Sequence, residues 1–354
     1  MRRWLVALIA LGASITAVGC GSSSTSTSTS SATTSEPAST QASTAAEEAP
    51  KDVKLAFVPK ALNIAYFTSA QKGAEEAAKQ VGVPLKVAGP TTLDPSSQIP
   101  FINTLSQQGT DVIMLAANDP NALMPAMKRA DAGGTKFVTW DSDVSSGRAI
   151  FVNQATVAST GETLVKLISE QMGGKGEVAI LSGTSTSTNQ NAWVDAIKAE
   201  LEKPEYSGLK LVKVAYGDSV PEKATSETLG LLQQYPNLGG IISPDAVGLP
   251  TAARVLDQKK LGGKVKLTGL ALPSSMKEYV KNGTVENFGL WDVEKLGYLA
   301  FFASYNLANG KITGAEGESF EAGDLGQFTI GENGEVVLGP LLVFDKSNID
   351  QYDF

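Results

Sequence analysis

From Asp52 onward, short apolar runs rich in β-branched residues alternate with longer stretches in which apolar residues recur every three or four positions. The short runs predict buried strands, and the longer stretches predict amphipathic helices. Strands that alternate with helices form parallel sheets covered on both faces. Because the alternation runs through two similar halves, the sequence predicts an α/β protein with two doubly wound lobes. The predicted strands are 53–58, 85–88, 112–116, 137–140, 149–152, 178–182, 211–215, 240–242 and 265–270, and the predicted helices are 69–81, 97–108, 122–132, 159–172, 192–201, 223–234 and 250–256.

The first twenty residues have the pattern of an export signal. A short basic start precedes an apolar run over residues 4–18 that is too short to span a membrane comfortably. The end of this run and the two residues after it, Ala17-Val18-Gly19-Cys20, resemble a bacterial lipobox. Leucine is commoner in that motif at the position that Ala17 occupies here. We therefore expect a lipoprotein signal peptide over 1–20 and a lipid on Cys20, the single cysteine. An ordinary signal peptide with an incidental cysteine is the alternative.

Residues 21–51 are dominated by Ser, Thr and Ala. Such a tract buries too little apolar surface to offset its ordering entropy, which predicts a flexible stalk. Random-coil scaling gives the stalk a reach of roughly 25 to 30 Å. The remaining residues, about 300, suit two domains better than one core.

Composition excludes several classes of function. The formal net charge is −8 and the pI is about 4.9, whereas a nucleic-acid surface needs a clustered basic face. The chain contains no histidine, which removes the commonest general base and most zinc or copper sites. With Cys20 assigned to the anchor, thiol chemistry is removed too. We expect a protein that is not an enzyme and carries no metal or cofactor.

Polar residues follow several predicted strands, and ligands of open α/β sheets bind beyond the carboxyl ends of the strands. They include one cation, several carboxylates, carboxamides and a tryptophan, a set that suits a neutral polyhydroxylated ligand with a ring to pack. The residues are Lys60, Asp141, Asp143, Asn153, Gln154, Asn189, Gln190, Asp245, Trp291 and Asp292.

Seven segments between about residues 54 and 354 resemble the periplasmic substrate-binding proteins of sugar-type ABC importers. Within that family the chain looks most like the receptors for the quorum signal autoinducer-2, with rhamnose-binding proteins near by. The segments are Phe57-Val58-Pro59-Lys60, Phe67-Thr68-Ser69, Thr139-Trp140-Asp141-Ser142-Asp143, Asn189-Gln190-Asn191-Ala192-Trp193, Pro244-Asp245-Ala246, Phe288-Gly289-Leu290-Trp291-Asp292 and Asn348-Ile349-Asp350-Gln351-Tyr352-Asp353-Phe354.

The resemblance implies a type I periplasmic-binding-protein fold whose two lobes are joined by a three-segment hinge. The expected lobes are 52–144 plus 273–312 and 145–272 plus 313–354. The implied partners are a small sugar-like ligand and an ABC permease with a separate ATPase subunit. We expect an extracytoplasmic monomer attached to the membrane through lipidated Cys20, with no nucleic-acid partner.

The family's autoinducer-2 site carries over to Lys60, Asp141, Gln190, Pro244 and Ala246. The resemblance implies that Lys60 donates to the ligand and Asp141 accepts from a diol, while Gln190 reads the opposite edge beside Asn189. Backbone groups at Pro244 and Ala246 would close the far wall. The other expected contributors are apolar faces from Phe67 and Trp291 and polar neighbours Asp245 and Asp292. Simple core packing is the alternative for the two aromatic residues, and helix capping is the alternative for Asp143 and Asp245.

Asn189 departs from the family, which has an aspartate at this position. Asparagine offers both an acceptor and two donors, whereas aspartate only accepts. A lost charge-assisted hydrogen bond weakens binding by about 1.5 to 3 kcal/mol, or about one to two decades. Autoinducer-2 is the expected ligand, with rhamnose or another deoxysugar or pentose as the alternative.

Three other classes of function compare less well with these residues or stay open. A glycosidase would need two carboxylates about 5 to 10 Å apart, for which Asp141 and Asp292 are the candidates. A sugar-repressor type of regulator shares the implied fold, but it needs a basic helix-turn-helix where this chain has a lipoprotein leader. A surface sensor that presents ligand to a receptor instead of a permease stays open.

Overall fold

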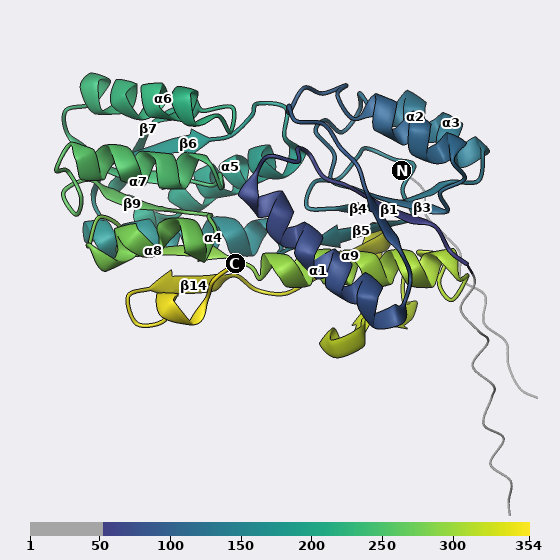
Figure 1. Cartoon of the computed structure of the whole chain (residues 1–354). Helices are drawn as coiled ribbons and strands as arrows, with labels where there is room; N and C mark the ends of the chain where they lie inside the picture. Colours follow the sequence, from purple (N-terminus) through teal and green to yellow (C-terminus); the bar gives the residue numbers. More distant parts are fainter. Residues whose placement is uncertain (1–51) are drawn as a thin grey trace, which may run out of the picture. The chain divides into compact units, whose positions relative to one another are not determined.

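Two parallel sheets organise the part of the chain that the structure, a computed structural model, describes, namely residues 52–354 (Figure 1). The expected signal peptide, the lipidated Cys20 and the stalk lie outside the described residues. Among those described, no helix has the length and apolar character needed to cross a membrane.

The first sheet has six strands in the order β13-β5-β4-β3-β1-β2, all parallel. Helices α1 and α9 cover one face of this sheet, and α2 and α3 cover the other (Figure 1). Alternate residues face opposite sides, so Phe57 belongs to the buried cluster that includes α1 and α9, whereas Val58 belongs to the cluster that includes α2 and α3. The strands are β1 (Leu55–Val58), β2 (Leu85–Val87), β3 (Val112–Leu115), β4 (Lys136–Trp140), β5 (Ile150–Asn153) and β13 (Glu335–Val337), and the helices are α1 (Ala65–Val81), α2 (Ile99–Gln107), α3 (Met124–Ala132) and α9 (Val293–Ala308).

The second sheet has the parallel order β7-β6-β8-β9, and a bridge between Leu270 and Gly289 extends it to β10. Strand β14 pairs antiparallel with β10. In the first sheet β1 lies between β2 and β3, and in the second β6 lies between β7 and β8. This order confirms the predicted α/β fold with doubly wound parallel sheets. The elements are β6 (Gly176–Ser182), β7 (Leu209–Tyr216), β8 (Leu238–Ser243), β9 (Lys266–Gly269), β10 (Asn287–Leu290), β14 (Leu342–Asp345), α4 (Val157–Met172), α5 (Thr188–Leu201), α6 (Pro221–Gln234), α7 (Gly248–Gln258) and α8 (Pro273–Lys281).

The strand pairing differs from the expected lobe boundaries at residues 144, 272 and 312. Strand β5 pairs with β4 and β13 in the first sheet, although the expected second lobe contains both β5 and β13. Helix α8 packs against α7 beside the second sheet, although it was expected in the first lobe. Parallel neighbours are usually joined through a helix, but none lies between β4 and β5. The chain leaves the first sheet after β5, returns between β10 and α9, and leaves again between β13 and β14.

Helices α1 and α9 approach closely because two glycines face the opposite backbone. A Cβ added to Gly73 would lie 1.7 Å from the carbonyl oxygen of Glu294, and one added to Gly297 would lie 1.8 Å from that of Ala70. This packing brings the start of α1, which holds Tyr66, close to the segment before α9, which holds Trp291. Both residues belong to the site described below.

The sequence pattern missed α8, α9 and the short elements near the C-terminus. Besides β13 and β14, these include the antiparallel hairpin β11 (Ser319–Glu321) and β12 (Gln327–Thr329) and the 3₁₀ turns Gly323–Leu325, Glu332–Gly334 and Ile349–Gln351; a further turn covers Pro204–Tyr206. Three-residue strands carry too little periodicity to be recognised.

Candidate ligand-binding site

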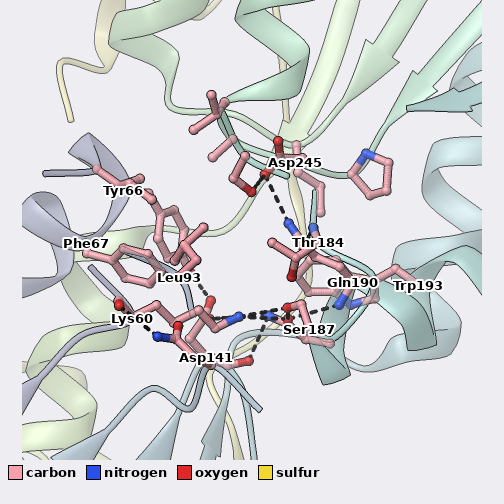
Figure 2. Close-up of a pocket in the computed structure, with 18 of the residues that line it drawn as sticks. Lys60, Tyr66, Phe67, Leu93, Asp141, Thr184, Ser187, Gln190, Trp193 and Asp245 are labelled. Atoms are coloured by element: carbon pink, nitrogen blue, oxygen red, sulfur yellow. Dashed lines mark hydrogen bonds and ion pairs between the residues drawn. The ribbon is translucent and has the colours of Figure 1, made fainter. Parts of the chain in front are cut away.

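A cavity lies between the carboxyl ends of the strands of the two sheets (Figure 2). The space that it encloses, with the open mouth and the adjoining solvent included, is about 610 Å³. All the expected site residues except Asp292 line it: Lys60, Phe67, Asp141, Asn189, Gln190, Pro244, Asp245, Ala246 and Trp291.

Lys60 reaches from the first sheet to the second. It lies two residues beyond β1, directly after Pro59, and its side chain is 9 % exposed. Its Nζ donates to Ser187 Oγ at 2.9 Å and to Asn189 Oδ1 at 3.2 Å. The same ammonium lies 3.4 Å from Asp141 Oδ2. Burial lowers the pKa of Lys60, and the negative charge of Asp141 opposes that shift.

Asp141 follows β4 directly, with a backbone φ of 61° in the left-handed region. Aspartate tolerates this conformation better than most residues because its short side chain bonds locally. Its Oδ1 accepts from the Tyr66 hydroxyl at 2.8 Å. Its backbone oxygen and Oδ2 accept from Asn189 Nδ2 at 3.1 and 3.3 Å. The carboxylate is therefore held from both sides of the cleft.

Tyr66 is a site residue that the sequence analysis missed. It lies in the first turn of α1, is 6 % exposed, and accepts from Trp291 Nε1 at 3.0 Å. Its ring meets those of Phe67 and Trp291 edge to face. Burial raises the pKa of Tyr66 well above its usual value, and the neighbouring charge of Asp141 raises it further.

Asn189 and Gln190 lie in the first turn of α5, whereas they were expected in a loop before a helix starting at 192. The polar run that precedes residue 192 has weak helix propensity and hid this turn. Asn189 Oδ1 accepts from Lys60, from Ser187 Oγ at 2.7 Å and from the backbone nitrogen of Gln190 at 2.9 Å. Because its Nδ2 donates to Asp141, both the oxygen and the nitrogen of the Asn189 amide are hydrogen-bonded.

Gln190 and Asp245 form the polar wall of the second sheet. Gln190 Nε2 donates to Asp245 Oδ1 at 3.0 Å, and Ser219 Oγ donates to the same oxygen at 2.8 Å. Asp245 Oδ2 accepts from the backbone nitrogen of Gly248 at 2.7 Å, so Asp245 also caps the start of α7. Burial raises the pKa of Asp245, and these hydrogen bonds oppose the rise.

Gly183 makes this wall possible. A Cβ at this position would lie 2.5 Å from the amide of Gln190 and 2.6 Å from Ser219 Oγ. The glycine after β6 therefore leaves the space in which both side chains reach Asp245.

Apolar groups cover the remaining walls. Trp291 and Phe67 line the cavity and are also buried, at 2 % and 6 % exposure, so site and core roles coincide. Trp193, another residue missed from the sequence, lies with its ring centroid 5.6 Å from that of Trp291. An aromatic and aliphatic wall opposite polar groups suits a small molecule with one hydroxylated and one apolar face.

Asp292, expected as a polar neighbour, is not among the residues that line the cavity. Its Oδ1 caps α9 by accepting from the backbone nitrogen of Lys295 at 3.0 Å. Helix capping was the alternative for Asp143, but its Oδ2 instead forms an ion pair with Arg148 Nη2 at 2.8 Å. The glycosidase pair of Asp141 and Asp292 therefore has only one member in the site.

Most of the missed lining residues carry no sequence signal of their own. Tyr66, Ser187 and Ser219 supply hydroxyls, but such residues occur throughout the chain and only the fold brings these three together. Ser187 was recognisable as a helix-start residue type. Among residues 52–354, no group of three or more His, Cys, Asp or Glu is placed to hold a metal ion.

The chain belongs to the periplasmic binding proteins, because residues 55–312 match the family model described as a periplasmic binding protein domain. The observed two-sheet architecture is the type I fold of that family, as expected.

Three solved structures illustrate the similarity. A sugar ABC transporter protein from Actinomyces odontolyticus is 44 % identical over 85 % of this chain and 98 % of its own, with a TM-score of 0.72. An ABC transporter solute-binding protein from Clostridium phytofermentas, solved with bound L-rhamnose, is 36 % identical over 86 % and 99 %, with a TM-score of 0.82. LsrB from Clostridium saccharobutylicum, solved in complex with AI-2, is 28 % identical over 85 % and 100 %, with a TM-score of 0.81.

Proposed function

We propose that this protein binds a small, uncharged, polyhydroxylated ligand between its two sheets and delivers it to an ABC importer. The observation that carries the proposal is the meeting of Lys60 and Asp141 from the first sheet with Gln190 and Asp245 from the second in one cavity. Lys60 is already paired with Asp141, and Asp245 faces three donors. An anionic ligand would therefore find the lysine already paired, whereas the hydroxyl groups of a neutral ligand can both donate to these carboxylates and accept from the donors around them.

Binding without turnover follows from this arrangement. A ligand that contacts groups on both sheets favours the closed arrangement by its greater affinity for that state. The closed form is then the signal that a membrane permease recognises. Family membership implies an extracytoplasmic location, and the proposed lipid on Cys20 would keep the protein near the permease and its separate ATPase.

Autoinducer-2 is the ligand that we propose first. Each of the five residues carried over from autoinducer-2 receptors lines the cavity, and a structural relative was solved with AI-2. L-Rhamnose is the second candidate. Asn189 departs from the autoinducer-2 pattern, and the relative solved with L-rhamnose is more similar in sequence.

A thermal-shift titration of the purified protein with autoinducer-2, L-rhamnose and D-ribose tests both candidates. A ligand present at 100 times its Kd and bound only to the native state adds about 2.7 kcal/mol of stability. A rise in Tm with autoinducer-2 alone supports the first candidate, and a rise with L-rhamnose alone supports the second. No shift with any neutral sugar would contradict the proposed ligand class. Loss of ligand uptake after deletion of the gene separates transport from surface sensing.

A further inference from the structure

We infer that Tyr66 is a positioning residue, which fixes the Asp141 carboxylate in the orientation needed to accept from the ligand. This inference rests on the proposed function. In this role Tyr66 affects binding through Asp141, in addition to lining the cavity itself.

A chain of hydrogen bonds links three segments that are distant in the sequence. Trp291, between β10 and α9, donates from Nε1 to the Tyr66 hydroxyl at 3.0 Å. Tyr66, on α1, donates to Asp141 Oδ1 at 2.8 Å. An indole nitrogen can only donate, so the phenol oxygen must be the acceptor in the first bond. The single phenol proton is therefore directed at Asp141.

Of the side chains that hold Asp141, Tyr66 is the one that takes no part in the Lys60–Asn189 hydrogen bond across the cleft. Lys60 and Asn189 also contact the carboxylate, but both bond to each other across the cleft. Because Lys60 follows β1 of the first sheet and Asn189 lies on α5 beside the second, a separation of the sheets would break the bond between them. Tyr66 instead packs edge to face against Phe67, with ring centroids 5.2 Å apart at 88°, and against Trp291, at 6.1 Å and 89°.

The backbone of Asp141 adds to the need for such a partner. Its φ of 61° places the residue in the left-handed region at the end of β4. The side chain therefore leaves the sheet in a direction that neighbouring strand residues do not share. A buried donor at 2.8 Å selects one orientation of the carboxylate from those that the backbone allows.

Tyr66→Phe tests the inference because it keeps the ring and removes only the hydroxyl. Tyr298→Phe is the matched control. Tyr298 is also 6 % exposed, and its hydroxyl bonds to Gln80 and to the backbone nitrogen of Asp324, but it does not line the cavity. We expect Tyr66→Phe to weaken binding of L-rhamnose or autoinducer-2, measured by calorimetry, about 10- to 100-fold. Tyr298→Phe should leave the Kd unchanged, while both variants lose stability.

A double-mutant cycle with Asp141→Gly separates positioning from direct contact, because glycine removes the acceptor of the Tyr66 hydrogen bond. Glycine adopts the same left-handed backbone readily, so the substitution adds no strain there. If Tyr66 acts through Asp141, Tyr66→Phe should weaken binding less than about threefold further in the Asp141→Gly background. An equal loss in both backgrounds would overturn the inference.

Crystal structures of the full-length wild type and Tyr66→Phe decide the question even where Asp141→Gly abolishes measurable binding. The Asp141 carboxylate should turn away from its wild-type position in the variant, and an unchanged carboxylate would overturn the inference. A wild type that binds none of the tested sugars would contradict the proposed ligands alone, because the carboxylate position would still report on Tyr66.

Discussion

Lys60 and Asn189 meet across the cavity, with 3.2 Å between the Nζ of the lysine and the Oδ1 of the asparagine. The asparagine amide presents its oxygen to the lysine and its nitrogen to Asp141. An aspartate at 189 could satisfy the lysine, but its oxygens would face the Asp141 carboxylate. The residue at 189 therefore determines whether the two sides of the cleft attract or repel at this point.

Asn189→Asp should change ligand preference. The variant restores the residue found in autoinducer-2 receptors, so autoinducer-2 should bind about one to two decades more tightly relative to L-rhamnose. Calorimetric titration of wild type and variant with both ligands measures the ratio. A ratio that does not move would show that Asn189 has no part in selecting the ligand. Asn237→Asp, at an exposed position outside the cavity, adds the same charge and controls for the change in net charge.

Asp245→Asn should alter the pH dependence of stability. Because burial raises the pKa of Asp245 in the folded state, the native protein binds its proton more tightly than the unfolded chain does. The stabilisation is present below the unfolded pKa of about 3.9 and is lost as the pH rises through the higher native pKa. Unfolding free energies between pH 4 and 8 should therefore fall more steeply for the wild type than for Asp245→Asn. Parallel curves for the two proteins would refute this expectation.

Gly73→Ala should destabilise the protein by about 1 to 3 kcal/mol, because its new methyl group would overlap the backbone of α9. Gly230→Ala is a control with the opposite expected sign. Gly230 lies inside α6 and a Cβ there meets nothing within 4 Å, so alanine should add roughly 0.5 to 1 kcal/mol of helix stability. Chemical denaturation measures both, and equal effects would contradict the assigned packing.

Asp292→Ala should affect stability but not binding. Loss of the α9 cap removes about 0.5 to 2 kcal/mol, while the Kd for the ligand should match that of the wild type. A weaker Kd without a loss of stability would return Asp292 to the site and contradict its assignment as a cap.

The parallel sheets and nine of the twenty residues that line the cavity could be predicted from the sequence. Apolar strands end in recognisable polar residues, and the carboxyl ends of parallel strands gather at one edge. The same local pattern could not separate Asp245, which enters the cavity and caps a helix, from Asp292, which only caps one. Both follow strands and precede helices, and only the path of the chain after each strand distinguishes them.

Features that depend on contacts between distant parts of the sequence could not be predicted from the local pattern of apolar and polar residues. Tyr66 depends on Asp141 and Trp291, which lie 75 and 225 residues away along the chain. The placement of β5 depends on its pairing with β13 near the other end of the protein. Neither partner leaves a trace in the local periodicity from which the elements were predicted.

The left-handed backbone at Asp141 limits how this site can evolve. Aspartate, asparagine and glycine occupy that conformation most readily, whereas a β-branched side chain there is strained. Descendants of this protein can therefore exchange the carboxylate for an amide or lose the side chain, but a valine or threonine would first need a different turn. Positions such as 189, in the regular geometry of a helix, tolerate a wider range of residues. New ligand preferences in this lineage should thus arise on the side of the second sheet, while residue 141 changes rarely.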